Sequence, residues 1–134
     1  MFVDAAAIVA ILSDEPEAAR CAAALLEAVD AVTSAIAAWE ASLALARPEK
    51  LGLSLEISER LVRRFLEDRG IILRDLPEAT DALSLALDAA RRYRGGPARL
   101  NLADCFHYAC ARHYRVPILS TATEFRATDL DTVA

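Results

Sequence analysis

The chain has 134 residues, a formal net charge of −5 and a pI near 5.0, and 55% of its residues are hydrophobic. This length predicts a single domain over residues 1–134 with its own core, and the composition excludes disordered, collagen-like and low-complexity classes. The chain lacks an apolar run of the roughly 18 residues that cross a bilayer and the basic start of a signal peptide, so we expect a cytoplasmic protein without membrane contact. The acidic balance argues at first against nucleic-acid binding, which usually needs a basic face.

The first half of the chain alternates short strands with helices. Residues 2–3 are predicted to form a strand that ends at Asp4, followed by a helix over 5–12. Ser13 to Glu17 carries helix-start signals, so a second helix is expected with an apolar face along 18–29. Residues 31–33 predict another strand. Ser34 can then cap a helix over 35–47, which Pro48 ends.

The second half continues this alternation. A helix is predicted from Ser54 to Gly70, and a strand over 71–73. The next helix opens at Pro77 and runs to residue 93, burying Leu83 on its apolar face, before a Gly-Gly-Pro loop. Asn101 caps a helix to about residue 114, and strands follow at 117–119 and near 131–133, with a short helix between them. This order predicts an α/β fold, a three-layer α/β/α sandwich whose short central sheet is mainly parallel.

The cysteine and histidine spacings do not indicate a site. The cysteines are odd in number and lack C-x-x-C spacing, which favours reduced core residues: Cys21, Cys105 and Cys110. His107 and His113 are out of phase on one predicted helix. Asp104 and His107, three residues apart, could share a metal, but a histidine that is satisfied in the core or faces solvent is more common.

The chain lacks the P-loop, the dinucleotide-binding glycine motif and the G-x-S-x-G elbow, which leaves carboxylates as the candidate chemistry. Asp4 follows a strand at the sheet edge where ligands bind, although it could be a solvated loop residue. Glu40 lies on the apolar face of its helix, where an acid pairs with an arginine, protonates or binds a metal. Asp104 fits a variant capping box with Asn101. Near the C-terminus, either Glu124 or Asp129 could supply a further acid.

Several carboxylates at one sheet edge cannot all ionise without a counter-charge. Mg²⁺ and Mn²⁺ prefer oxygen ligands and suit phosphodiester chemistry, so a divalent-metal site at this edge is our hypothesis from the residues. Arginines also surround the Gly-Gly-Pro loop. A solvated charged face is the ordinary interpretation of that cluster, and phosphate contact through Arg94 and Arg99 is the functional one.

Four segments in order resemble the PIN domain, and specifically the VapC toxins of bacterial toxin–antitoxin pairs. These are FVDAAAIVAILSDEPEA, TSAIAAWEASLALAR, RLNLADCFHYACA and PILSTATEFRATDLDTVA, which together cover nearly the whole chain. The sequence departs from the family pattern at Ala6, where a small hydroxyl residue is common. It departs again in the closing segment, where Thr121-Ala122-Thr123 leaves Glu124 as the acid before Phe125.

The resemblance implies an Mg²⁺- or Mn²⁺-dependent endoribonuclease toxin that cleaves RNA phosphodiester bonds through a water activated by the metal and so inhibits growth. The family's metal-binding acids fall on Asp4, Glu40, Asp104 and Glu124. The implied partners are RNA, a VapB-type antitoxin that neutralises the toxin and a second copy in a homodimer, with DNA reached only through the antitoxin.

Asn101, Arg94 and Arg99 are the candidate substrate-binding residues. The alternative is a catalytically weak PIN-like module that acts through its antitoxin–DNA complex, because the closing segment is altered. The four candidate acids are part of the net charge of −5, so the acidic pI is compatible with a metal pocket on an RNA-binding protein.

Overall fold

The computed structural model describes residues 1–133, and Ala134, the last residue of the predicted domain, lies outside the described residues. The strands are β1 (Phe2–Val3), β2 (Val32–Ser34), β3 (Ile72–Arg74), β4 (Ile118–Leu119) and β5 (Thr132–Val133). The helices are α1 (Ala5–Leu12), α2 (Ala18–Glu27), α3 (Ala35–Leu45), α4 (Leu55–Asp68), α5 (Ala79–Tyr93), α6 (Leu102–Tyr114) and the short 3₁₀ helix η1 (Thr123–Ala127). Strand positions agree with the predicted ones to within about a residue.

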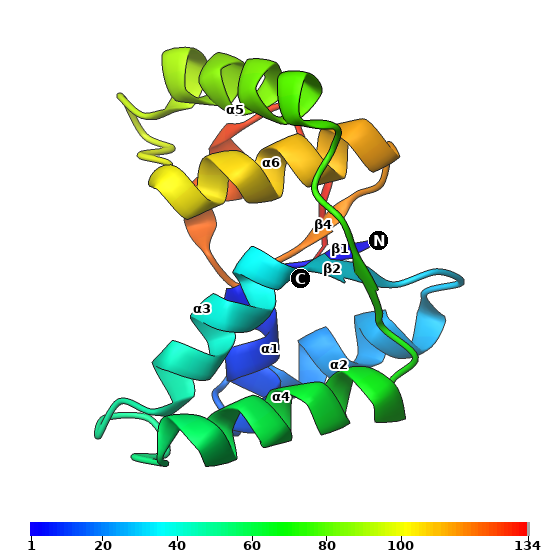
Figure 1. Ribbon diagram of the computed structural model, residues 1–134, viewed down its shortest axis with the longest axis vertical. Coiled ribbons are helices and arrows are strands. Elements are labelled where there is room, and N and C mark those ends of the chain that lie inside the picture. The colour runs from blue at the N-terminus through cyan, green and yellow to red at the C-terminus, as the bar shows by residue number, and fades with distance from the viewer. Residues whose placement is uncertain (134) are drawn as a thin grey trace.

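The strands form one parallel sheet in the order β3-β2-β1-β4-β5. Helices α5 and α6 lie on one side of this sheet, and α1 to α4 lie on the other (Figure 1). The predicted α/β sandwich is therefore confirmed, and every pairing in the sheet is parallel. Such an arrangement follows from right-handed crossovers between parallel strands. The connections from β1 through β2 to β3 place α1 to α4 on one face of the sheet, and the connection from β3 back to β4 places α5 and α6 on the other.

Strands β1 and β4 meet at the point where the strand order reverses. Their register pairs Phe2 with Ile118 and Val3 with Leu119. Strand order reversals of this kind leave a crevice at the carboxyl ends of the strands, because the helices that follow them diverge to opposite faces. The residues that follow β1 and β4 therefore lie beside one another at the edge where a ligand can bind.

The core lies on both faces of the sheet and includes all three cysteines, which are free and buried, as predicted. Several predicted core positions were wrong, because Leu26, Val29, Ala79 and Leu83 are exposed. Val29 is 96% exposed because α2 ends at Glu27 and the chain turns extended at Ala28. Leu83 is 57% exposed because α5 packs on α6 through a narrow stripe of alanines. No helix within residues 1–133 is long and apolar enough to cross a membrane.

Candidate active site

Asp4 is buried at the reversal of strand order, between the end of β1 and the start of α1. Its backbone N–H donates to the carbonyl of Leu119 at 3.0 Å, which ties it to the end of β4. The hydroxyl of Ser120 donates to Asp4 Oδ2 at 2.6 Å, and Ser120 itself is fully buried. The backbone N–H of Ala122 donates back to Ser120 Oγ at 3.0 Å. Asp4 is therefore held from β4, in a fixed orientation at the sheet edge.

Asp104 comes to the same edge from the first turn of α6. Its Oδ2 accepts a hydrogen bond from the Asn101 backbone N–H at 2.8 Å, while Asn101 Oδ1 accepts from the Asp104 N–H at 3.0 Å. The predicted capping box is thus present with both of its bonds. Because the cap engages Oδ2, the other oxygen of Asp104 remains for a ligand. One carboxylate can serve the helix cap and a site at once.

Glu40 approaches from α3, which begins directly after β2 with Ser34 as its N-cap. The side chain is 29% exposed, so the predicted burial on an apolar face is only partial. Its nearest charged partner is not an arginine. Glu40 Oε2 lies 3.4 Å from Nε2 of His107, a residue of α6 that is fully buried.

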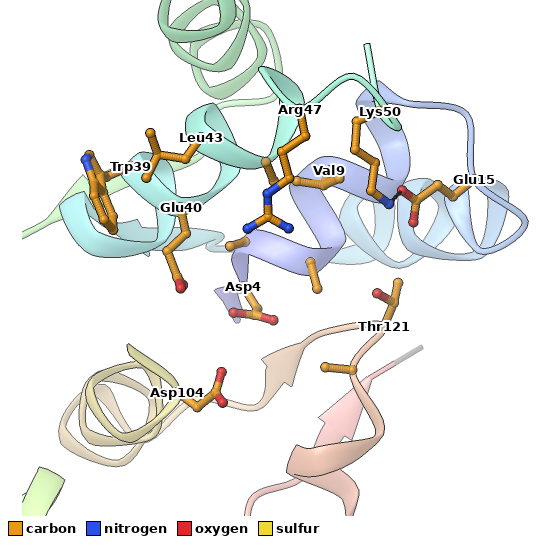
Figure 2. Close-up of a pocket in the computed structure, with 14 residues that line it drawn as sticks. Asp4, Val9, Glu15, Trp39, Glu40, Leu43, Arg47, Lys50, Asp104 and Thr121 are labelled. Carbon is orange, nitrogen blue, oxygen red and sulfur yellow. Dashed lines mark hydrogen bonds and ion pairs between the residues drawn. The ribbon is translucent and has the colours of Figure 1, made fainter. Parts of the chain in front are cut away.

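These three acids face one cleft of about 490 Å³. Figure 2 shows the carboxylates of Asp4, Glu40 and Asp104 directed toward a common space from three separate elements. The guanidinium of Arg47, just after α3, points into the same space. Trp39 lies at one end of the cleft and is 59% exposed, and Lys50 lies at the other end, paired with Glu15. The cleft therefore combines an acidic floor with two cations and an aromatic ring at its rim.

The charges in the cleft perturb one another. Burial, followed by the charges of Asp4 and Asp104, raises the pKa of Glu40. Burial and the charge of Asp4 likewise raise the pKa of Asp104, despite the hydrogen bond that Asp104 accepts from Asn101. Burial would also raise the pKa of Asp4, but the contacts with His107 and Ser120 outweigh it and hold that pKa below its ordinary value. The cleft carries more negative charge than its own cations neutralise.

The remaining predicted residues lie outside the cleft lining. Glu124 is half-buried in η1 and close enough for its charge to raise the pKa of Asp104. Asp129 accepts hydrogen bonds from Tyr108 at 2.8 Å and Arg92 at 2.9 Å. Asp129 is thus already paired, and of the two late acids Glu124 is the one that acts on the cleft electrostatically.

The three predicted substrate-binding residues are exposed at the start of α6 and in the loop before it. Asn101 is engaged as the helix cap, as described above. Arg94 caps the end of α5, and Arg99 has a left-handed backbone with φ of 49°. Neither arginine lines the cleft, so any RNA that they contact must extend beyond it.

Sequence reasoning missed two residues that hold the acids. Ser120 follows β4 just as Asp4 follows β1, and residues at equivalent positions after two paired parallel strands lie side by side. This equivalence could have indicated Ser120 from the sequence. His107 lies three residues after Asp104 and so shares its helix face, a spacing that suggested a metal shared by these two residues but no contact with Asp4. In the structure its Nδ1 lies 2.8 Å from Asp4 Oδ1.

The donor set of the cleft fits a hard divalent cation. Carboxylate oxygens are the ligands that Mg²⁺ and Mn²⁺ prefer, and a cation would offset the burial and the repulsion that together raise the pKa values of Glu40 and Asp104. Within residues 1–133, no three acidic, histidine or cysteine side chains already stand close enough to hold an ion.

Comparison with known proteins matches residues 1–130 to the PIN domain family. Ribonuclease VapC42 of Mycobacterium tuberculosis is 38% identical over 136 residues, covering 97% of this chain and 96% of the relative. The crystal structure of M. tuberculosis VapC20, described as a sarcin-ricin loop cleaving toxin, gives a TM-score of 0.75 at 13% identity and covers 96% and 95% of the two chains. A toxin–antitoxin complex from Klebsiella pneumoniae gives 0.71 at 16% identity over 99% and 95%. At these identities the two structures support the fold.

Proposed function

The chain belongs to the PIN domain family, with VapC ribonucleases among its relatives, and from this premise we propose that it is the endoribonuclease toxin of a toxin–antitoxin pair, dependent on Mg²⁺ or Mn²⁺. The family membership agrees with the resemblance inferred from the four sequence segments. The observation that carries the proposal is the convergence of Asp4, Glu40 and Asp104 on one cleft from three separate elements. We take residues 1–134 as a single PIN-like domain.

Asp4 and Asp104 are the principal ligands in this proposal, and Glu124 completes the acidic pocket. When bound, a divalent cation lowers the pKa of a water and stabilises charge on the phosphate. Glu40 orients the attacking water and is placed to accept the proton that this water loses. Attack by water on the phosphodiester breaks the bond between phosphorus and the 3′ oxygen, which takes a proton from solvent, and so leaves a 5′-phosphate and a 3′-hydroxyl.

The rim of the cleft suits single-stranded RNA. Arg47 points into the cleft and forms no ion pair within residues 1–133, so its guanidinium is available to a phosphate. The exposed ring of Trp39 offers a surface on which a base can stack. Asn101, Arg94 and Arg99 would contact RNA beyond the cleft. Neutralising Arg94 and Arg99 together is expected to weaken RNA binding and flatten its salt dependence, and an unchanged salt slope would remove them from the interface.

The proposed biology follows from this activity. A VapB-type antitoxin occludes the cleft, the toxin forms a homodimer, and DNA is reached only through the antitoxin. Cleavage of cellular RNA in the cytoplasm then inhibits translation and growth. The toxin–antitoxin complex from Klebsiella pneumoniae shares the fold and supports the choice of an antitoxin as partner.

The test uses the purified, antitoxin-free protein on RNA, with Mn²⁺ or with EDTA. We expect cleavage that EDTA abolishes and that Asp4→Asn eliminates, because Asn keeps the shape of Asp4 but removes its charge. Glu67→Gln is the matched control, since it neutralises an exposed acid on α4 away from the cleft. If Asp4→Asn cleaves as fast as Glu67→Gln, the site is wrong. A wild-type protein that binds antitoxin but neither cleaves RNA nor is stabilised by Mn²⁺ would instead be a binding module.

A further inference from the structure

His107 is a buried polar residue that lies between two of the cleft acids. Its side chain has no solvent exposure, and its ring packs against Phe2 with centroids 5.8 Å apart. Nδ1 lies 2.8 Å from Asp4 Oδ1, and Nε2 lies 3.4 Å from Glu40 Oε2. Neither nitrogen makes a hydrogen bond of good geometry within residues 1–133. Buried polar groups normally have partners, so the two nearby carboxylates explain why a histidine is buried at this position.

The ring links three parts of the fold that are distant in sequence. His107 comes from α6, Asp4 from the β1–α1 junction, and Glu40 from the middle of α3. Both nitrogens face carboxylates and neither reaches the open cleft, so the imidazole is placed to act through the acids rather than to bind a cation itself. Asp4 is then held on both oxygens, by His107 at Oδ1 and by Ser120 at Oδ2. Carboxylates that bind metals are commonly held in this way by a second layer of polar partners.

We propose that His107 is a positioning residue that holds the carboxylates of Asp4 and Glu40 in place for a divalent cation. The inference rests on the proposed function, because it assumes that these acids bind the cation. Without the imidazole, Asp4 would lose its partner at Oδ1 and Glu40 would lose the ring nitrogen that lies 3.4 Å from its Oε2. The two acids could then turn apart, and cation binding would have to bring them back together.

The test is Mn²⁺ binding by the full chain without RNA, measured by isothermal titration calorimetry. Three variants separate the two contacts. His107→Asn keeps a nitrogen near the position of Nδ1, His107→Gln keeps one near Nε2, and His107→Leu removes both. We expect His107→Leu to bind Mn²⁺ about 10- to 100-fold more weakly than wild type, the range for loss of such a partner. His107→Asn should restore more affinity than His107→Gln, because the Asp4 contact is the shorter one.

His113→Leu is the matched control, since this second histidine of α6 contacts Tyr114 edge to face and lies outside the cleft. Thermal melting of each variant in EDTA shows whether it is folded, and the polar variants keep the test valid if the leucine variant is not. Wild-type affinity in all three His107 variants would overturn the inference and leave the proposed function intact. Absence of Mn²⁺ binding by the wild-type protein would overturn both.

Discussion

Replacing Asp104 with asparagine should separate the chemistry of the cleft from the stability of α6. Asparagine retains a carbonyl oxygen that can accept the 2.8 Å bond from the Asn101 N–H, so the cap survives. Loss of a negative charge at a helix N-terminus costs about 0.3–1 kcal/mol. Removing the charge also relieves its burial and its repulsion from Asp4, which together raise the pKa of Asp104, and this acts in the opposite direction. Because the lost interaction with the helix terminus and the relieved destabilisation of the charge are similar in size and opposite in sign, the melting temperature should change by less than about 3 °C.

Asn101→Ala is the reciprocal variant, because it removes the acceptor of the 3.0 Å bond from the Asp104 N–H while leaving the acid. Loss of such a cap costs about 1 kcal/mol, or roughly 3 °C in melting temperature for a chain of this size. In Mn²⁺, Asp104→Asn should reduce single-turnover RNA cleavage at least about 100-fold, equivalent to about 2.7 kcal/mol. Asn101→Ala should retain more of the cleavage. Asp104→Asn with near-normal cleavage, or with a larger loss of stability than Asn101→Ala, would refute the reasoning.

Two further predictions concern the protein without metal. The raised pKa values of Glu40, Asp104 and His107 mean that the folded state binds protons at these groups more tightly than the unfolded state. Melting temperatures in EDTA should therefore fall from about pH 5 to about pH 8, and Mn²⁺ should restore more stability at the higher pH. A melting temperature that does not change with pH contradicts this prediction. Burial raises the pKa of the Cys110 thiol to about 11, and all three cysteines are buried, so a thiol reagent should react only after unfolding in guanidinium. Rapid labelling of the native protein would contradict the core assignment.

The sheet and the positions of two acids could be predicted because both depend on local sequence. Short apolar strands between helices require parallel crossovers, and their carboxyl ends meet at one edge, which placed Asp4. The spacing of Asn101 and Asp104 indicated the capping box, and the cap brings Asp104 to that edge. In each case the signal lies within a few neighbouring residues.

The contacts of His107 could not be predicted, because its partners Asp4 and Glu40 are more than 60 residues away in the chain. Helical periodicity indicates which face carries an apolar or polar residue, but not which element covers that face. The same limit explains Leu83, which has the spacing of a core residue but lies beside the alanine stripe that α5 uses against α6. The contacts of His107 and the exposure of Leu83 both depend on which distant elements pack together.

The chemistry of the product ends tests the central claim most directly. RNA cleaved by the purified protein in Mn²⁺ is sequenced at its new ends, with Asp4→Asn as the parallel control. Attack by water in a carboxylate–cation site predicts a 5′-phosphate and a 3′-hydroxyl, produced by the wild type and lost in the variant and in EDTA. A 2′,3′-cyclic phosphate that persists in EDTA would contradict the account, because it would mean that the RNA's own 2′-hydroxyl is the nucleophile and that no cation is needed.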